Sequence, residues 1–125
     1  MNELCNNFEL YPISDVVSIT GNAVVFKEGS VPVKLVADNI DLQPTASTST
    51  SGTLHTTESD VLVEKVSEAV ARRYANVRSC LLLFKKLTGE TVVVGSLIYP
   101  AKVYIIPLLS RDRVKIRCNS LRSAL

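Results

Sequence analysis

The 125-residue sequence predicts a single α+β domain: an antiparallel β-meander with one amphipathic helix packed on a face, plus an N-terminal β-hairpin. Two observations carry this prediction. Residues 79–118 contain four short apolar runs separated by turn residues, which is typical of strands joined by tight turns. Residues 60–77 change to a period near 3.6, which is typical of a helix with one apolar face. A helix against an antiparallel sheet forms a two-layer α+β domain.

Residues 1–43 are expected to form N-terminal strands or an arm. Asp15–Thr20 and Ala23–Lys27 are apolar runs joined by Gly21-Asn22, and both turn residues tolerate positive φ. This pattern predicts a two-residue hairpin. A further apolar segment, Val31–Val36, follows as a short strand.

Residues 44–58 are expected to form a Ser/Thr-rich loop or arm. Pro44–Thr53 reads PTASTSTSGT and has almost nothing to bury. It is interpreted either as a surface loop or as an arm that adds a strand to a neighbouring subunit. The candidate contact residues of this segment are Thr45, Ser47, Thr48, Ser49, Thr50 and Ser51.

Residues 59–125 are expected to contain the helix and then the four-stranded meander. The predicted apolar face of the helix consists of Leu62, Val66, Ala69, Val70 and Val77, with Tyr74 at its margin. Ser59 or Asp60 would cap its start and Asn76 would end it. Asp60–Glu64 (DVLVE) also alternates like a strand, so a later start near Lys65 remains open.

The meander strands are expected over Cys80–Phe84, Thr91–Val94, Lys102–Ile106 and Arg113–Cys118. The predicted core positions are Leu82, Phe84, Val92, Val94, Val103 and Ile105. The opposite face carries Leu81, Leu83, Val93, Tyr104 and Ile106, which is too apolar to be left in water. The N-terminal hairpin or another chain is expected to cover it.

The last of these runs carries the candidate binding residues. Arg113, Lys115 and Arg117 alternate with apolar residues, so a strand would present three cations about 7 Å apart on one face. Lys85, Lys86, Arg111 and Arg122 could extend this patch. Such a row suits a polyanion or a protein partner, whereas a solvated outer strand is the simpler alternative. Aromatic residues, on which single-stranded nucleic acids stack, are absent from this run, which makes nucleic acid the less favoured partner.

The charge is divided unevenly along the chain. Residues 1–60 carry two basic and eight acidic side chains, whereas residues 61–125 carry twelve basic and four acidic ones. Three interpretations follow: the halves face each other within one fold, the acidic surface of one subunit meets the basic surface of another, or the basic half binds nucleic acid.

No pattern in the sequence predicts a catalytic or metal site. His55 is the only histidine, the three cysteines form no CxxC pair, and no nucleotide-binding or hydrolase motif occurs. Cys80 and Cys118 are expected to be buried free thiols. We expect no enzymatic activity, cofactor or small-molecule substrate. No apolar run reaches the ~18 residues of a membrane span, and the N-terminus does not resemble a signal peptide.

The segment Val61–Cys118 resembles small structural proteins of tailed bacteriophages and of prophages of gut bacteria. The resemblance rests on an apolar helix pattern followed by the Thr88-Gly89 turn, the Val94-Gly95-Ser96 triplet and the Tyr99-Pro100 corner. It implies a virion component made in the bacterial cytoplasm: a head–tail connector, a tail protein or a capsid accessory protein. Homo-oligomers and contacts with other virion proteins are then expected. The alternatives are a nucleic-acid-binding module or a small regulatory domain that binds one protein.

Overall fold

The computed structural model describes residues 4–20, 23–37, 40, 43–49 and 52–120 of the chain. Most of these residues lie in strands, so the molecule is mainly β and the predicted α+β class is wrong. The helical segments among them are the short helix α1 (Glu68–Arg73) and a single 3-10 turn, η1 (Ile13–Asp15). The strands are β1 (Leu4–Pro12), β2 (Val16–Thr20), β3 (Ala23–Phe26), β4 (Val33–Val36), β5 (Gln43–Ser49), β6 (Gly52–Val63), β7 (Arg78–Lys86), β8 (Thr91–Val94), β9 (Ala101–Pro107) and β10 (Asp112–Ser120).

One large antiparallel sheet organises the molecule. Its strand order is β4-β1-β7-β9-β10-β6-β5, and β8 pairs with β7 outside this path. The sheet curls until the segment after β4 reaches β6, because Ala37 forms an antiparallel bridge with Val63 at the end of β6. The Glu64 N–H donates to the Val36 carbonyl at 2.9 Å at the same place.

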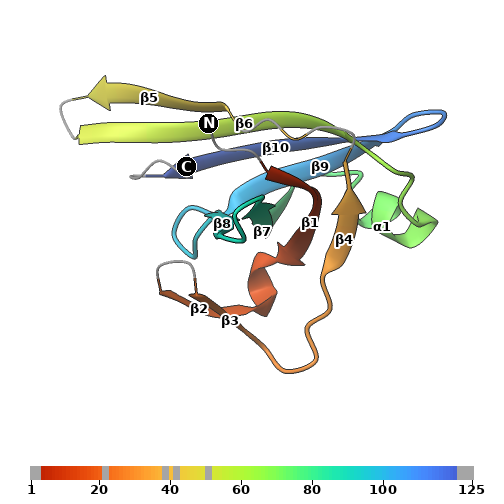
Figure 1. The fold of residues 1–125 in the computed structure, drawn as a ribbon, viewed down its shortest axis with the longest axis horizontal. Helices are drawn as coiled ribbons and strands as arrows, with labels where there is room; N and C mark the ends of the chain where they lie inside the picture. Colours follow the sequence, from red (N-terminus) through yellow and green to blue (C-terminus); the bar gives the residue numbers. More distant parts are fainter. Residues whose placement is uncertain (1–3, 21–22, 38–39, 41–42, 50–51, 121–125) are drawn as a thin grey trace.

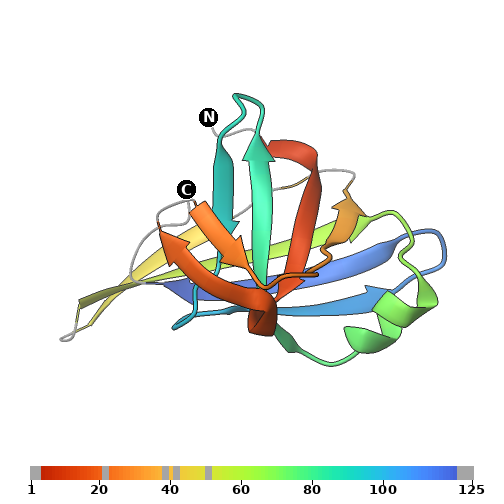
Figure 2. The same ribbon diagram turned by 90° about the horizontal axis from the view of Figure 1, so that it is seen from below.

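The curled sheet appears as two crossing layers. Strands β5, β6, β10 and β9 form one layer, and β1, β7 and β8 lie below it (Figure 1). Seen from below, β7, β8 and β1 cross the direction of β6, β10 and β9 steeply (Figure 2). The facing sides of the two layers enclose one apolar core, supplied by β1, β4, β6, β7, β8, β9 and β10.

The six predicted core residues, Leu82, Phe84, Val92, Val94, Val103 and Ile105, are all buried in this core. Phe84 stacks on Phe8 of β1 with the ring centroids 4.9 Å apart. Cys80 and Cys118 are buried free thiols, as expected. The inward positions of these strands follow directly from the alternation in the sequence.

The four predicted strands exist, but they do not form a meander. Strand β8 pairs with β7 from Leu82 to Lys85, and β9 pairs with the same edge of β7 from Arg78 to Cys80. After pairing with β7 as β8, the chain makes an excursion away from β7 over residues 95–100 and then returns to pair with it again as β9. Gly95 begins the excursion with φ +112°, and an added Cβ would lie 3.1 Å from Ala101 N and from Cys80 O.

The predicted helix over residues 60–77 is wrong except at its centre. Residues 60–63 belong to β6, where Val61 and Val63 point inward and Leu62 outward. Helix α1 begins after Ser67, whose Oγ accepts a hydrogen bond from the Val70 N–H at 3.3 Å. Tyr74 is the residue that anchors this segment: its side chain is fully buried, and its carbonyl accepts a hydrogen bond from Ile105 N–H.

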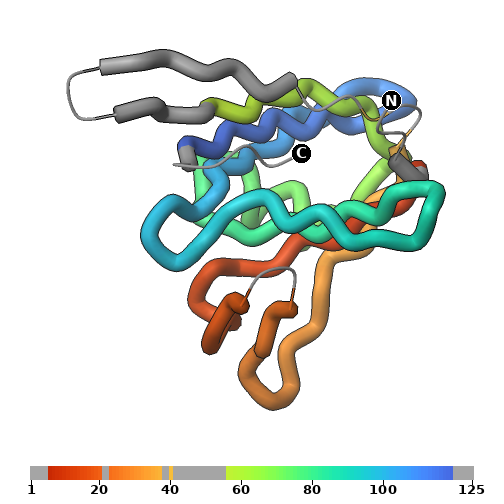
Figure 3. The backbone as a smooth tube through the Cα atoms, turned by 60° about the vertical axis from the view of Figure 1, so that its left-hand side comes forward, coloured from red at the N-terminus to blue at the C-terminus, as the bar shows by residue number. Residues whose placement is uncertain are grey.

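The N-terminal hairpin is present as the β2–β3 pair, in which Thr20 lies opposite Ala23. It forms its own small sheet at the bottom of the molecule, below β7 and β8 (Figure 3). Tyr11 and Phe26 stack with ring centroids 3.9 Å apart, and Tyr11 is the register partner of the buried Leu81. The hairpin therefore covers part of the outer apolar face of β1 and β7. The sequence predicts that either this hairpin or another chain covers that face.

The Ser/Thr-rich segment forms strand β5 over Gln43–Ser49 instead of a surface loop. It pairs with β6 of the same chain, with Thr45 opposite Thr56 and Thr48 opposite Thr53. The β5–β6 ribbon extends beyond the other strands at one end of the sheet (Figure 1). Within the described residues, the structure has no helix of the length and apolarity that a membrane span requires.

Candidate functional site

The outer face of β6, β10 and β9 carries the candidate binding residues. Arg113, Lys115 and Arg117 share this face, while Val114, Ile116 and Cys118 of the same strand are buried. Residues directly opposite each other in an antiparallel pair lie on the same face. The register therefore creates three cross-strand rows, which are Ile106–Arg113–Leu62, Tyr104–Lys115–Asp60 and Lys102–Arg117–Glu58.

Each of the three cations on β10 has a carboxylate partner on β6. Asp60 lies between two of them, with Oδ1 3.3 Å from Arg113 Nε and Oδ2 3.0 Å from Lys115 Nζ. Arg117 Nε lies 3.4 Å from Glu58 Oε1. The side chains of these pairs are between 37% and 66% exposed, so water weakens each ion pair. The face is a mixed-charge surface with a small positive excess.

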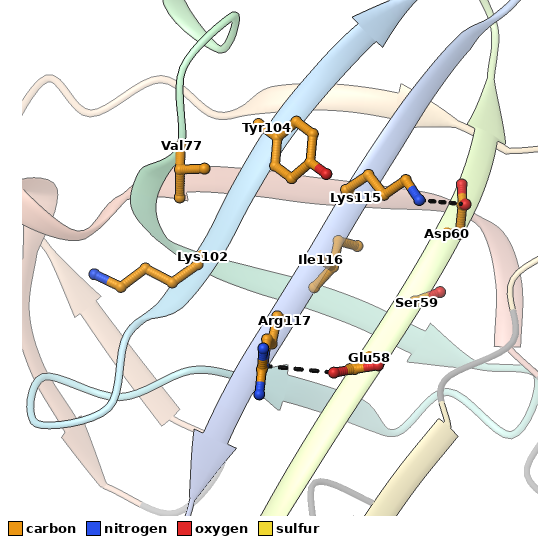
Figure 4. Close-up of a pocket in the computed structure, with 9 residues that line it drawn as sticks. All are labelled: Glu58, Ser59, Asp60, Val77, Lys102, Tyr104, Lys115, Ile116 and Arg117. Atoms are coloured by element: carbon orange, nitrogen blue, oxygen red, sulfur yellow. Dashed lines mark ion pairs between the residues drawn. The ribbon is translucent and has the colours of Figure 1, made fainter.

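A shallow hollow of about 600 Å³ lies over the centre of this face. Tyr104 and Lys115 are adjacent in it, and Lys102 and Arg117 line its lower part (Figure 4). Lys102 Nζ donates to Ser79 Oγ at 2.6 Å and pairs with no carboxylate of the described residues, so Lys102 gives the hollow its positive excess. We call the outer side of β6, β10 and β9, including this hollow, the β10 face.

One end of the β10 face is apolar. Leu62 and Ile106, on either side of Arg113, are 37% and 36% exposed. The turn after β9 continues this character, because Leu108 is partly exposed and Leu109 is fully exposed. Exposed leucines next to arginine and tyrosine are typical of protein interfaces, where aromatic residues and Arg are enriched.

The sequence predicted the shared face of the three cations but not their surroundings. Glu58, Asp60 and Tyr104 reach the β10 face from other strands, and cross-strand register was not visible in the sequence. The charge division offered the only hint: Glu58 and Asp60 belong to the acidic half and the cations to the basic half. The interpretation that the two halves face each other within one fold therefore holds for these residues.

The Ser/Thr-rich candidates lie elsewhere. Thr45, Ser47, Thr48 and Ser49 are in β5, on the opposite side of β6 from β10. Thr50 and Ser51 lie outside the described residues. The β5 positions and the cations are therefore separate features of the sheet.

A second group of polar residues lies where α1 meets β7. The Tyr74 hydroxyl is buried and no group of the described residues meets it with hydrogen-bond geometry, although Cys80 and Arg73 lie close enough to influence its pKa. Burial raises the pKa of Tyr74 to about 12, and the nearby Cys80 thiol contributes further. Burial also raises the pKa of Cys80 to about 11, so this thiol is protonated at neutral pH and a poor nucleophile.

Over the residues that the structure describes, no cluster of three or more His, Cys, Asp or Glu side chains is arranged to hold a metal ion.

Comparisons with known proteins found no family model, no curated protein and no solved structure that matches this chain.

Proposed function

We propose that this chain is a non-enzymatic assembly subunit of a bacteriophage virion that acts by self-association and by docking to other virion proteins. Its place would be the head–tail connector, the tail or the capsid surface. The virion setting comes from the resemblance of Val61–Cys118 to small phage structural proteins. The β10 face supplies the physical support.

The ion pairing of the β10 cations is the observation that carries this proposal. A phosphate track presents cations that are free to neutralise phosphates. On the β10 face, Glu58 and Asp60 already contact all three cations, so a polyanion would have to compete with these carboxylates. A protein partner with both acidic and basic side chains could instead form ion pairs with the cations and carboxylates of the three cross-strand rows at the same time. Tyr104 and Leu62 would then provide apolar contact area.

Light scattering at low and high salt tests self-association. The expected result is a discrete oligomer, or a mass that rises with protein concentration. A monomer at every concentration and salt would contradict the proposal.

A charge-matched pair of variants tests the β10 face itself. Changing Arg113, Lys115 and Arg117 together to Ser should weaken docking or association. The control changes three exposed cations to Ser with the same loss of charge. These are Arg72 and Arg73 of α1 and Lys85, which the structure places on β7 beside β8 and not on the β10 face. Equal effects of the two triple variants would show that net charge, and not the β10 face, is responsible.

A nucleic-acid-binding module is the second candidate, because Tyr104 lies beside Lys115 and offers one stacking surface that the basic strand itself lacks. Fluorescence anisotropy with a single-stranded oligonucleotide would detect it as affinity that falls steeply with salt. Asp60→Asn should then tighten binding, since it removes a competing carboxylate. Salt-independent or absent binding, with no gain in Asp60→Asn, would eliminate this candidate.

A further inference from the structure

Strand β5 forms an open end of the large sheet. It is the last strand in the sheet order and pairs only with β6, so its other edge has no strand partner among the described residues. In Figure 1 this edge forms the upper margin of the molecule, and no other described element covers it. Unpaired backbone N–H and C=O groups along a strand are a template for another strand.

The β5 edge has no charged residue to oppose such pairing, and its one protective residue is Pro44, near the start of the strand. Natural edge strands are kept short, or carry Pro or charged residues, especially Lys. Strand β4, at the other end of the sheet order, is four residues long and carries the exposed Lys34. Strand β5 has seven residues, and no Asp, Glu, Lys or Arg occurs in the sequence between Asp41 and Glu58.

The same strand is chemically suited to pair with itself. Within the chain β5 lies along residues 52–58 of β6, with Thr45 opposite Thr56 and Thr48 opposite Thr53. Like charges placed directly opposite each other across two strands are unfavourable, and β5 carries none. A second β5 would present the same neutral residues and meet no repulsion.

We propose that a second copy of this chain pairs antiparallel with the β5 edge about a twofold axis, so that the two large sheets become one. This inference rests on the self-association in the proposed function and names the surface that would perform it. The partner is a second copy of β5 because this strand, which has no charged residue, meets no like charge when it pairs with its own copy. The β10 face would remain free for other proteins.

The symmetry makes a specific geometric demand. A twofold axis that relates two antiparallel strands of one sheet runs perpendicular to that sheet, and one residue of β5 then lies opposite its own copy. Opposite Cα atoms are about 4.5–5.5 Å apart, within the range of about 4.4–6.8 Å that disulfides need. A residue one step along the strand is about 8 Å from its copy, given a rise of about 3.3 Å per residue.

A cysteine scan tests this demand. Single Cys substitutions at positions 45 to 49 are made in a Cys5→Ser background, which leaves Cys80 and Cys118 buried. Under mild oxidation, one position should form a disulfide-linked dimer in high yield and its neighbours should not. Ser18→Cys, on an exposed position of β2, is the control and should not cross-link. Equal cross-linking along β5, or equal cross-linking of the control, would overturn the inference.

A charge placed on the edge gives an independent test. Ser47→Lys should raise the dissociation constant of the oligomer by about tenfold or more at low salt, because two lysines approach each other across the axis. Ser47→Asn should leave it unchanged. If the wild-type chain is a monomer, the proposed function fails together with this inference. If it assembles normally while the scan and Ser47→Lys have no effect, only the β5 inference fails.

Discussion

Lys65 and Asp112 form an ion pair in which only the acid is buried. Lys65 Nζ lies 2.6 Å from Asp112 Oδ1, and the two side chains are 45% and 1% exposed. Asp112 Oδ2 also accepts a hydrogen bond from the Val66 N–H at 2.9 Å, and Lys65 donates to the Leu108 carbonyl at 2.8 Å. One carboxylate thus ties the segment before α1 to the turn between β9 and β10.

Asp112→Asn should destabilise the protein by about 1–3 kcal/mol, because it removes the charge from a buried, fully hydrogen-bonded site. Urea unfolding would measure this loss. Glu68→Gln is the control, since its ion pair with Arg72 is almost 80% exposed on both sides and should contribute less than about 0.5 kcal/mol. Similar losses in the two variants would contradict the structural role of Asp112.

The stabilisation from Asp112 should depend on pH. Burial alone would raise the pKa of Asp112, but the hydrogen bonds from Lys65 and Val66 and the Lys65 charge outweigh it and lower the pKa. In the unfolded chain the Asp112 carboxyl has a pKa of about 3.9. In acid it therefore binds more protons in the unfolded chain than in the folded one. The advantage of wild type over Asp112→Asn should therefore be complete above pH about 4 and disappear as pH falls through the lowered pKa of the folded state. An advantage that persists unchanged in acid would refute this linkage.

Tyr74→Phe should leave the protein as stable as wild type or up to about 1 kcal/mol more stable. The hydroxyl is buried without a hydrogen-bond partner among the described residues, and such a group costs free energy in the folded state. Tyr74→Ala should instead cost about 3–5 kcal/mol, because it empties a fully buried site. A clear loss in Tyr74→Phe would mean that the hydroxyl bonds to a neighbour such as Cys80.

Gly95→Ala should destabilise the protein more than Gly89→Ala. Both glycines have positive φ, +112° and +96°, so either substitution introduces backbone strain of about 1 kcal/mol. Only at Gly95 would the new Cβ also crowd Ala101 N and Cys80 O, each 3.1 Å away, while nothing lies within 4 Å at Gly89. Thermal unfolding of the two variants compares them directly, and equal shifts would show that the excursion from β7 tolerates a Cβ.

The sequence predicted strands well where alternation alone determines burial. Leu82, Phe84 and Val94 are inward because every second residue of a strand faces one side. The order of the strands was not predictable in this way, since the position of β9 beside β7 depends on the excursion at Gly95. Pairing between distant segments leaves no local pattern.

The helix prediction failed for a related reason. Leu62, Val66, Val70 and Val77 match a helical period, yet Leu62 lies in a strand and Val77 is 57% exposed. The alternation of Asp60–Glu64 was the better guide, because β6 continues through Val63 to meet β10. A short period match cannot distinguish the two structures when the pairing partner lies about fifty residues away.

For the candidate site, alternation correctly predicted that Arg113, Lys115 and Arg117 share a face. It could not reveal that Glu58 and Asp60 would lie beside them, because that depends on the register between β6 and β10. Alternation also placed Tyr104 on the outer face, but its position beside Lys115 depends on the register between β9 and β10. The chemistry of this face depends on three strands together.

Strand β10 has a further consequence for how the chain folds during synthesis. It is the last described strand in chain order, yet it lies between β9 and β6. While the ribosome is still making residues 112–120, β6 and β9 have already been synthesised without the strand that joins them, and the core lacks Val114, Ile116 and Cys118. Apolar surface and open strand edges are then exposed to other nascent chains. Folding is therefore expected to follow translation of this segment, and shortening the chain before Asp112 should yield an aggregating product instead of a smaller domain.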